Sequence, residues 1–413
     1  MKMKNKLKNS FLFPVLVYLR YWIIRYIINR EFISHKLERG SKIKPVDSDI
    51  TFFGYYNISP ENENDEILFL KVGQEKVRGS LFEPANIMLK KSDGSISKIA
   101  ETKAWNWQQG CMLQWLSSNN EQILFNDYDE ERDKYISRVI DKDGRQLKTF
   151  NIPVNNVSKC GKYALSLNYD RLAKMRPDYG YFNKTNSNLP PDNQDGIWHL
   201  DLTNEEYRLV ISLKHLREIS YSETMNGAIH KVNHIDISPS SNRFMFLHRW
   251  VGSKGRFMRL ITANPDGSNL QIMNGDIMTS HCCWIDSKYI LSYCEYKGQR
   301  GYFKFLDQST EVDFFSKKMP SVDGHPSVSP DEKWLITDTY PDKARMSYLY
   351  LHNIEKDEIH TLGRFHQPLR YKKEIRIDLH PKWSVDGSSV FFESGHSNFR
   401  KLYRMSINKN LNQ

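Results

Sequence analysis

The stretch VSPDEKWLITD, residues 328–338, places an apolar residue before a polar Ser-Pro-Asp turn and a β-rich run after the turn. The same pattern recurs along the 413-residue chain, with turns that begin at seven positions. These positions are Ser59, Ser117, Ser158, Ser238, Asp286, Ser329 and Ser384. A repeat of this kind is typical of solenoids and propellers, so it decides the fold class.

Most of these turns are roughly 40–60 residues apart, which matches one four-stranded propeller blade for each repeat. A second pair of alternating strands follows most turns, as in GYFKFLDQSTEVDFF at 301–315. The wider interval between Ser158 and Ser238 predicts an insertion. We therefore predict an all-β fold in which residues 46–413 form one seven-bladed β-propeller, a closed ring that protects its strand edges.

Residues 1–45 precede the repeats and hold most of the net charge. They contain eleven Lys/Arg and only two acidic residues, so they carry +9 of the chain's net charge of +10. The remaining residues are nearly neutral, whereas a nucleic-acid-binding domain is expected to carry a basic face. We therefore expect no nucleic-acid partner.

Between Phe11 and Ile28 the chain is strongly apolar but is interrupted by Arg20 and Arg25. Each arginine near the centre of a spanning helix costs roughly 2.5–3.5 kcal/mol, and no small-residue cleavage site follows the apolar run as in a signal peptide. The pattern favours a helix in the membrane interface, with basic side chains near anionic headgroups. The side chains expected to enter the bilayer are Phe13, Tyr18, Tyr21, Trp22, Ile23, Ile24 and Ile27. The alternatives are an uncleaved spanning anchor and a helix docked on its own domain.

The five cysteines are odd in number, scattered, and without metal-type C-x-x-C spacing. They are Cys111, Cys160, Cys282, Cys283 and Cys294. This usage favours a reducing compartment, with each cysteine as a buried apolar residue. Together with the basic segment, it predicts a cytoplasmic protein attached peripherally to the inner face of the membrane.

Histidines recur at one position of the repeat, three residues before the apolar residue that precedes each turn. The last four repeats place His234, His281, His325 and His380 there, whereas the first three place Tyr55, Met112 and Val154. Equivalent positions of successive blades surround the central axis, so we expect the four imidazoles to converge at one mouth of the channel. Imidazole is a ligand for divalent metals and the usual general base. The alternative is that these histidines are duplicated remnants that bind neighbouring loops.

Other polar residues are candidates for the same mouth. Asp378 lies two residues before His380, on the same face of an extended strand, and suits a metal ligand or a group that orients one. The predicted insertion contains Arg171, Arg176, Tyr179 and Tyr181, which suit a carboxylated sugar through paired hydrogen bonds and ring stacking. Arg249 is a weaker candidate for the rim. A solvated loop with buried tyrosines is the alternative for the insertion.

The segments NHIDISPSSNRFMFLHRW (233–250), SHCCWIDSKYILSYC (280–294), GHPSVSPDEKWLITDTYPD (324–342) and DLHPKWSVDGSSVFFES (378–394) resemble the oligogalacturonate lyase family of metal-dependent propellers. The resemblance implies cleavage of uronic-acid chains by β-elimination, with a manganese-type ion held by histidines and a glutamine. It implies a catalytic-site role for His234, which follows Asn233 as in the family, and metal-ligand roles for His281 and His380.

The chain departs from the family in its last ligand motif, Q-x-x-H-x-H. Ile375 and Asp378 occupy the first two ligand positions, so the glutamine is lost and one histidine has become an acid. His325 is a further candidate ligand. No motif locates the family's catalytic arginine; Arg208 and Arg217 are candidates by position, and Arg171 is a third.

The resemblance predicts a lyase-like propeller that cleaves a uronic-acid glycan by metal-assisted β-elimination, and we expect a role in surface-polysaccharide metabolism. A divalent ion, Mn²⁺ by preference, is expected at His281, His325, Asp378 and His380, and an acidic polysaccharide or oligosaccharide as the partner, beside a membrane surface at the N-terminal segment. The rival hypothesis is a non-catalytic propeller that binds a glycan or an assembly partner at the membrane, since fold alone does not decide function.

Overall fold

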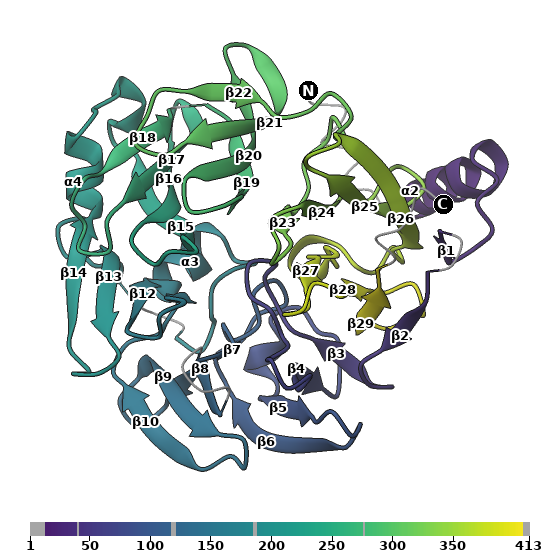
Figure 1. Cartoon of the computed structure of the whole chain (residues 1–413), viewed down its shortest axis with the longest axis horizontal. Helices are drawn as coiled ribbons and strands as arrows, with labels where there is room; N and C mark the ends of the chain where they lie inside the picture. The colour runs from purple at the N-terminus through teal and green to yellow at the C-terminus, as the bar shows by residue number, and fades with distance from the viewer. Residues whose placement is uncertain (1–12, 39–40, 117–120, 185–187, 276, 408–413) are drawn as a thin grey trace.

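The computed structural model describes residues 13–38, 41–116, 121–184, 188–275 and 277–407. Within these ranges almost every element is a β-strand, and seven sheets surround a central axis (Figure 1). The predicted seven-bladed β-propeller is confirmed. The turn that begins at Ser117 and residues 1–12 of the N-terminal segment lie outside the described residues.

The first four blades each contain four antiparallel strands in chain order. Blade 1 consists of β3 (Ile50–Phe52), β4 (Ile67–Val72), β5 (Ala85–Lys90) and β6 (Ile96–Thr102). Blade 2 consists of β7 (Gln114–Trp115), β8 (Gln122–Asp129), β9 (Lys134–Asp141) and β10 (Gln146–Phe150). Blade 3 consists of β11 (Asn156–Val157), β12 (Tyr163–Leu167), β13 (Gly196–Asp201) and β14 (Tyr207–Ser212). Blade 4 consists of β15 (Ile229–Ile237), β16 (Phe244–Gly252), β17 (Gly255–Ala263) and β18 (Gln271–Asn274).

The last three blades include both N-terminal strands. Blade 5 consists of β19 (Thr279–Trp284), β20 (Tyr289–Tyr296), β21 (Gln299–Leu306) and β22 (Val312–Phe314). Blade 6 consists of β23 (Ser327–Val328), β24 (Trp334–Asp338), β25 (Met346–Asn353), β26 (Glu358–His366) and, at its outer edge, β1 (His35–Leu37). Blade 7 consists of β27 (Lys382–Trp383), β28 (Ser389–Ser394), β29 (Lys401–Ser406) and β2 (Ile43–Pro45).

The ring closes through the N-terminal strand β2. It pairs antiparallel with β29, with Ile43 opposite Met405, so the two ends of the chain complete one blade together. Strand β1 pairs with β26 in the same way, with His35 opposite Phe365. Residues 35–37 and 43–45, which the sequence assigned to the N-terminal segment, are therefore strands of the propeller. Closure of this kind pairs the edges that an open sheet would expose.

The strand order defines two faces of the ring. The first strand of each blade is the innermost one, and the turns of the repeat connect it to the second strand on what we call the turn face (Figure 1). Because neighbouring strands are antiparallel, the first strand begins on the opposite face. The loop between the second and third strands and the connection to the next blade lie on that opposite face as well. We call it the histidine face, because the four predicted histidines precede or begin the first strands there.

The apolar residue before each turn joins neighbouring blades. Trp284 of blade 5 donates a hydrogen bond from its indole Nε1 to the Asp236 carbonyl oxygen of blade 4, at 3.0 Å. Trp383 of blade 7 donates in the same way to the Ser327 carbonyl oxygen of blade 6, at 3.0 Å. A buried indole needs a hydrogen-bond partner for its N–H. The carbonyl oxygen of the preceding blade is that partner, while the indole itself packs between the two blades. Blades 5 and 7 therefore share this contact with the preceding blade, as well as the order of residues in the repeat.

The predicted insertion lies in blade 3 and beyond it. Strand β12 leads to β13 through α3 (Tyr169–Met175) and a long loop, and β14 leads to β15 through α4 (Leu213–Glu218) and the short helix η3 (Glu223–Met225). The side chain of Asn168 caps α3 by accepting a hydrogen bond from the Arg171 backbone N–H at 3.0 Å. Both connections lie on the histidine face. Two more short helices, η2 (Gly79–Leu81) and η4 (Lys373–Ile375), lie on this face.

The N-terminal helix consists of α2 (Phe13–Trp22) and the π-helical η1 (Ile23–Ile28), beside blade 6 (Figure 1). The Tyr21 hydroxyl lies 2.9 Å from Nε2 of His366, and the buried Arg25 donates to the Ile33 carbonyl oxygen at 2.8 Å. Tyr21, which was expected to enter a bilayer, therefore contacts the propeller. One side of the helix is docked on its own domain.

The other side of this helix is open to solvent. Val15, Tyr18 and Ile27 are each more than half exposed, which is unusual for apolar side chains of a docked helix. Among the described residues, no helix has both the length and the apolar content needed to cross a membrane. All five cysteines are free, and Cys160 is exposed, so the expectation that every cysteine is buried is wrong for that residue.

Candidate metal and substrate site

The four histidines of the repeat lie together on the histidine face. His234 and His281 belong to β15 and β19, and His325 and His380 precede β23 and β27. Successive ring centroids are 6.3, 4.1 and 4.3 Å apart from His234 through His281 and His325 to His380. None of the four is more than 5% exposed. The four blades therefore bring their imidazoles into one buried cluster, as their common position in the repeat predicted.

Local backbone distortion directs two of these side chains. His234 and His380 have φ values of +60° and +45°, in the left-handed region that non-glycine residues rarely adopt. In β15 the pairing register also shifts between Asn233 and Asp236, on either side of His234. Bulges and left-handed residues turn a side chain away from its regular direction, and they concentrate at functional sites. Met112, at the equivalent position of blade 2, has the same left-handed conformation, whereas His281 and His325 do not.

Three predicted ligands form a group with the arrangement that a metal ion needs. One ligand atom each from His325, Asp378 and His380 lies within 4.8 Å of the other two. Nε2 of His325, Oδ1 of Asp378 and both ring nitrogens of His380 are buried and have no hydrogen-bond partner among the described residues. Buried polar atoms are almost always paired, so this cluster of unpaired atoms is a candidate cation site. These residues fit a divalent metal.

Asp338 orients two of the three ligands. Its Oδ1 lies 2.8 Å from Nδ1 of His325, and its Oδ2 accepts a hydrogen bond from the His380 backbone N–H at 3.1 Å. Burial alone would lower the pKa of His325, but the charge and hydrogen bond of Asp338 outweigh it and raise the pKa. With its Nδ1–H donated to the carboxylate, His325 directs the lone pair of Nε2 toward Asp378 and His380. A carboxylate behind an imidazole is the usual support of a metal-binding histidine.

His281, the fourth predicted ligand, has a different partner. Its Nδ1 lies 3.1 Å from Oδ1 of Asp323, and it is not part of the three-residue group, although it lies beside His325. Burial lowers the pKa of His281, so the imidazole is a neutral neighbour of the group. Sequence reasoning missed Asp323 and Asp338. The D-x-H spacing that identified Asp378 recurs at Asp323 and His325 and could have found the first; nothing local signals the second.

His234 is held by two tyrosines from blade 1. The hydroxyls of Tyr55 and Tyr56 lie 2.9 Å from its Nδ1 and Nε2, and Nε2 also lies 2.9 Å from the Cys282 carbonyl oxygen. A carbonyl oxygen only accepts, so Nε2 carries the proton and Nδ1 accepts from the Tyr55 hydroxyl. Burial lowers the pKa of His234 to about 3 and raises that of Tyr55 well above its usual value. Both residues are therefore neutral, and Tyr55 stands between His234 and His380.

Cationic side chains surround the same cluster. Arg249 is half-buried, and its buried Nε has no hydrogen-bond partner among the described residues. Lys231 is buried, and burial together with the charges of Arg249 and Arg176 lowers its pKa to about 6. Guanidinium charge strong enough to lower the pKa of a neighbouring lysine favours an anionic ligand nearby. Arg176 and Arg249, predicted to bind substrate, therefore lie where a carboxylate would be stabilised.

A chain of ion pairs covers the cluster. Arg376 contacts Asp378 on one side and Asp178 on the other, each at 2.7 Å, and Asp178 also contacts Arg176 at 3.2 Å. The Arg176 guanidinium lies over the Tyr179 ring at 4.6 Å, which in turn packs against Tyr55. The insertion of blade 3 and the connection into blade 7 thus meet above the histidines. Sequence reasoning missed Arg376 and Asp178.

Three predicted site residues have structural roles elsewhere. Arg171 is buried in an ion pair with Asp195 at 2.5 Å and also donates to backbone oxygens, so it holds the insertion in place. Tyr181 is fully buried and stacks on Tyr169 with ring centroids 4.3 Å apart, which makes it a core residue. Arg217 lies on α4, where its contact is Asp192 at 3.1 Å. The insertion was rightly singled out, but only Arg176 and Tyr179 of its predicted residues reach the cluster.

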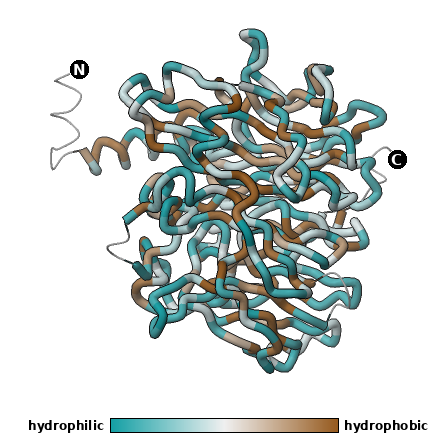
Figure 2. Tube along the Cα trace, turned by 90° about the vertical axis from the view of Figure 1, so that its left-hand side faces the viewer, coloured by the Kyte–Doolittle hydropathy of each residue, from teal (hydrophilic) through white to brown (hydrophobic). Residues whose placement is uncertain are grey.

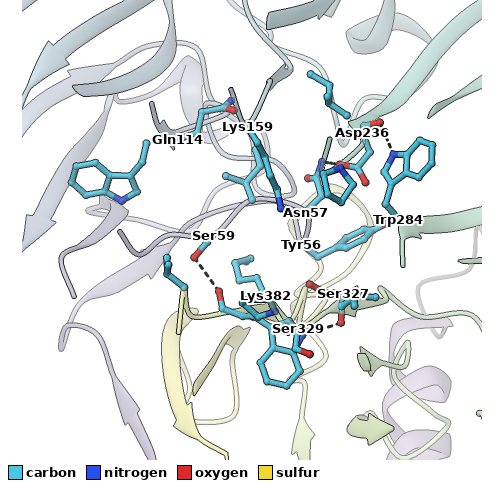
Figure 3. Close-up of a pocket in the computed structure, with 18 of the residues that line it drawn as sticks. Tyr56, Asn57, Ser59, Gln114, Lys159, Asp236, Trp284, Ser327, Ser329 and Lys382 are labelled. Atoms are coloured by element: carbon cyan, nitrogen blue, oxygen red, sulfur yellow. Dashed lines mark hydrogen bonds between the residues drawn. The ribbon is translucent and has the colours of Figure 1, made fainter. Parts of the chain in front are cut away.

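A larger cavity, of about 630 Å³, opens on the turn face (Figure 3). Its lining comes from the ends of the first strands, such as Gln114, Asp236 and Lys382 (Figure 3). Tyr56 lines this cavity with its ring while its hydroxyl binds His234, so it separates the two ends of the channel. Lys382 donates to the Gly54 carbonyl oxygen at 2.9 Å. The metal-type group lies at the opposite end of the channel.

Comparison with known proteins yields matches in structure only. No protein-family profile matches the chain, and no curated protein matches its sequence. An oligogalacturonate lyase from Vibrio parahaemolyticus superposes with a TM-score of 0.62 and 12% identity, over 91% of this chain and 97% of the lyase. An oligogalacturonate lyase in complex with manganese gives a TM-score of 0.64 and 13% identity, over 91% and 96%.

A third neighbour has a different activity. A puromycin-hydrolysing peptidase from Mycobacterium tuberculosis superposes with a TM-score of 0.53 and 10% identity, over 87% of this chain and 52% of the peptidase. At these identities the matches establish the propeller fold, and with the oligogalacturonate lyases a distant relationship at most.

Proposed function

We propose that this protein is a lyase that cleaves a uronic-acid-containing glycan by β-elimination. The observation that carries the proposal is the group of unpaired buried ligand atoms at His325, Asp378 and His380, near the Arg249 guanidinium, whose buried Nε is also unpaired. A metal-type group and a carboxylate-binding group in one buried site are what elimination from a uronate requires.

The three ligands suit a divalent ion of the manganese type, since imidazole and carboxylate together accept such ions. The chemistry that a bound ion supplies is neutralisation of the substrate carboxylate, whose charge otherwise keeps the C5 proton weakly acidic. Arg249 and Arg176 add to this neutralisation. The replacement of the family glutamine by Ile375 removes one polar group from the site, so pectin fragments are one candidate substrate among several uronates.

Tyr55 and His234 are positioned to move the proton. The Tyr55 hydroxyl donates to Nδ1 of His234, so its oxygen can take the C5 proton as its own proton passes to the imidazole. The electron pair of the C5–H bond then forms the C4–C5 double bond, the C4–O bond breaks, and the leaving oxygen takes up the proton that His234 returns through Tyr55. His234 acts through Tyr55, because tyrosine hydroxyls lie against both of its ring nitrogens.

The rival function, a propeller that binds a glycan without cleaving it, is favoured by one observation. The histidines are at most 5% exposed and lie under the Arg376–Asp178 ion pair. Catalysis requires this cover to open, whereas a structural metal site does not. The two functions therefore differ in whether substrate reaches Tyr55.

The test is incubation of the manganese-loaded protein with polymers of galacturonate, glucuronate and iduronate. A lyase releases chains that end in an unsaturated, ultraviolet-absorbing uronate, which hydrolysis cannot produce. His380→Ala should abolish the signal, while His352→Gln, a buried histidine of blade 6 that contacts Asp357 on the turn face, should not. Absence of the chromophore with all three polymers, with metal bound, contradicts the lyase and leaves the binding function.

A further inference from the structure

The N-terminal helix docks on the histidine face. Tyr21 contacts His366, the last residue of β26, from which the chain crosses to the histidine of blade 7. Arg25 lies 3.4 Å from the Ala344 carbonyl oxygen, in the loop between the second and third strands of blade 6. Both contacts belong to connections of the histidine face. Figure 2 shows the coloured, described part of the N-terminal helix at one side of the molecule.

Exposed apolar side chains favour the same face. Outside the N-terminal segment, fourteen large apolar side chains are exposed among the described residues, and ten of them lie on histidine-face connections or strand ends. They include Phe82, Tyr221, Ile229, Val251, Val322 and Phe399, which come from different connections around the mouth. The remaining four, Ile96, Leu147, Tyr207 and Val385, lie at or near the turn face. Single exposed apolar residues are ordinary, but their concentration on one face is not.

Basic side chains lie beside these exposed apolar side chains of the histidine face, which we call the apolar tips. Lys76 lies over the Phe82 ring at 4.6 Å, and Arg370 lies over the Phe399 ring at 5.7 Å. Lys254 and Lys343 are exposed on neighbouring loops of the same face. Aromatic side chains with adjacent Lys or Arg are typical of the boundary between water and an anionic bilayer.

We propose that the whole histidine face is a membrane-docking face, with the N-terminal helix as one part of it, and that the mouth of the propeller opens toward an anionic lipid surface. The apolar tips are separate from one another and come from connections all around the ring. A flat, fluid surface can contact all of them at once, whereas a protein partner would need a matching ring of pockets. The exposed face of α2, including Val15 and Tyr18, extends the same surface.

This orientation bears on the substrate. A mouth that faces lipid takes glycan chains attached at the membrane rather than free polymer, a consequence that rests on the proposed lyase function. Docking itself does not rest on it, because none of the tip residues belongs to the metal group or its cover. Anionic vesicles should therefore lower the turnover of a soluble uronate oligosaccharide, because they cover the mouth, whereas vesicle binding itself is measured without substrate.

The first experiment measures binding of the full chain to phosphatidylcholine vesicles with and without phosphatidylglycerol. The variant Phe82→Ser, Tyr221→Ser, Phe399→Ser should bind anionic vesicles roughly ten- to a hundred-fold more weakly than the unaltered protein. The matched control carries Ile96→Ser, Tyr207→Ser and Val385→Ser on the turn face and should bind as the unaltered protein does. Equal loss in both variants, unchanged binding of the first, or no binding of the unaltered protein overturns the proposal.

The second experiment determines orientation. Cys160, on the turn face, is the exposed cysteine among the five and accepts a polarity-sensitive fluorophore. A second protein carries Cys160→Ser and Ser253→Cys, which moves the label to the loop between β16 and β17 on the histidine face. Vesicles should shift the emission of the label at residue 253 to the blue and leave that at residue 160 unchanged.

A shift at residue 160, or at neither position, overturns the proposal. Light scattering of the free protein tests the other occupant of this face, a second copy of the chain. A dimer that the Phe82, Tyr221 and Phe399 substitutions dissociate, without vesicle binding, assigns the face to self-association and also overturns membrane docking.

Discussion

The first three blades and the last four share the same strand arrangement but carry different side chains at one position of the repeat. All seven place a residue at the same position of the repeat, ahead of the turn, but blades 1 to 3 place Tyr55, Met112 and Val154 there, and blades 4 to 7 place histidines. Met112 and Val154 are buried in apolar clusters, while the histidines form the metal-type group and its neighbours. The comparison shows that a repeat keeps its scaffold constant while one variable position determines which side chains form the buried cluster.

Blades 1 and 3 still contribute to the site by other means. Blade 1 supplies the hydroxyls of Tyr55 and Tyr56 to His234, and the insertion of blade 3 supplies Arg176 and Asp178 to the cover. The C-terminal blades thus supply the candidate ligands, and the N-terminal blades supply the side chains that contact, orient and cover the histidine cluster. Each prediction below tests this division, from the largest expected effect to the smallest.

Removal of two candidate ligands should give the largest difference between a substitution in the C-terminal blades and one in the N-terminal blades. The variant His325→Ala, His380→Ala should purify without a divalent ion, because a single remaining ligand, Asp378, cannot retain one. Met112→Leu, a change of similar volume at the equivalent position of blade 2, should keep about one ion per chain. Elemental analysis of chelator-free preparations measures both. A full complement of metal in the double variant would show that the ion lies elsewhere.

Tyr55→Phe tests whether an N-terminal blade takes part in the chemistry. Loss of the hydroxyl that donates to His234 should lower turnover by roughly 10²–10⁴-fold with metal content unchanged. Tyr181→Phe, which removes another buried hydroxyl of the N-terminal half, should leave turnover close to that of the unaltered protein. The measurement is kcat on whichever uronate polymer is cleaved. Full turnover by Tyr55→Phe would restrict catalysis to the C-terminal blades.

Asp338→Asn tests the support of the ligands. The carboxylate accepts from His325 and from the His380 backbone, so its loss should weaken metal affinity by roughly 10–100-fold without removing a ligand. Asp357→Asn, which alters the partner of His352 on the turn face, should leave affinity unchanged. Metal titration by calorimetry compares the two. Equal affinities would mean that Asp338 serves folding only.

Acid should destabilise the C-terminal blades first. Between Lys36 and Trp198 the chain contains no histidine, whereas blade 4 buries His230 against His248 at 2.9 Å. Burial lowers the pKa of His230 to about 4 and that of His248 well below its usual value of 6.5. Between pH 6.5 and pH 4 these histidines bind protons in the unfolded chain but not in the folded chain. Their contribution to the free energy of unfolding is therefore fully present above pH 6.5 and is lost as the pH falls toward 4. Each such histidine adds up to about 1.4 kcal/mol of loss per pH unit.

Hydrogen exchange at pH 5 should accordingly show faster opening in blade 4 than in blade 2. The variant His230→Asn, His248→Gln should flatten the dependence of unfolding free energy on pH, whatever its effect at neutral pH. An unchanged slope would locate the acid sensitivity in other groups.

The smallest effect should be the same in both halves. Trp115 of blade 2 and Trp284 of blade 5 each donate an indole N–H to the preceding blade at 3.0 Å. Replacement of either by Phe should lower the free energy of unfolding by roughly 1–2 kcal/mol, as expected for a lost hydrogen bond and a small void. Urea denaturation measures it. Clearly unequal losses would show that the scaffold, too, differs between the halves.

The fold was predictable because its signal is local and repeated. A polar turn after an apolar residue and before a β-rich run, as at Ser238 or Ser329, marks the first hairpin of a blade wherever it occurs. The cluster of histidines was predictable for the same reason, since equivalent positions of a ring must converge. Asp378 was singled out by its spacing from His380, although neither residue lies in a strand and His380 has a left-handed φ. Arg171 and Tyr181 were placed wrongly because the insertion has no repeat from which to read the direction of a side chain.

The sequence by itself determined the number of blades, the position that carries the chemistry and the histidines that occupy it, since each depends on a pattern with a fixed register. Only the tertiary structure decided which atoms remain unpaired, that Asp338 and Asp323 lie behind His325 and His281, and that Arg376 covers the group. It also decided that the N-terminal helix docks on the histidine face. These facts depend on contacts between segments far apart in the chain, and the loops that make them follow no period.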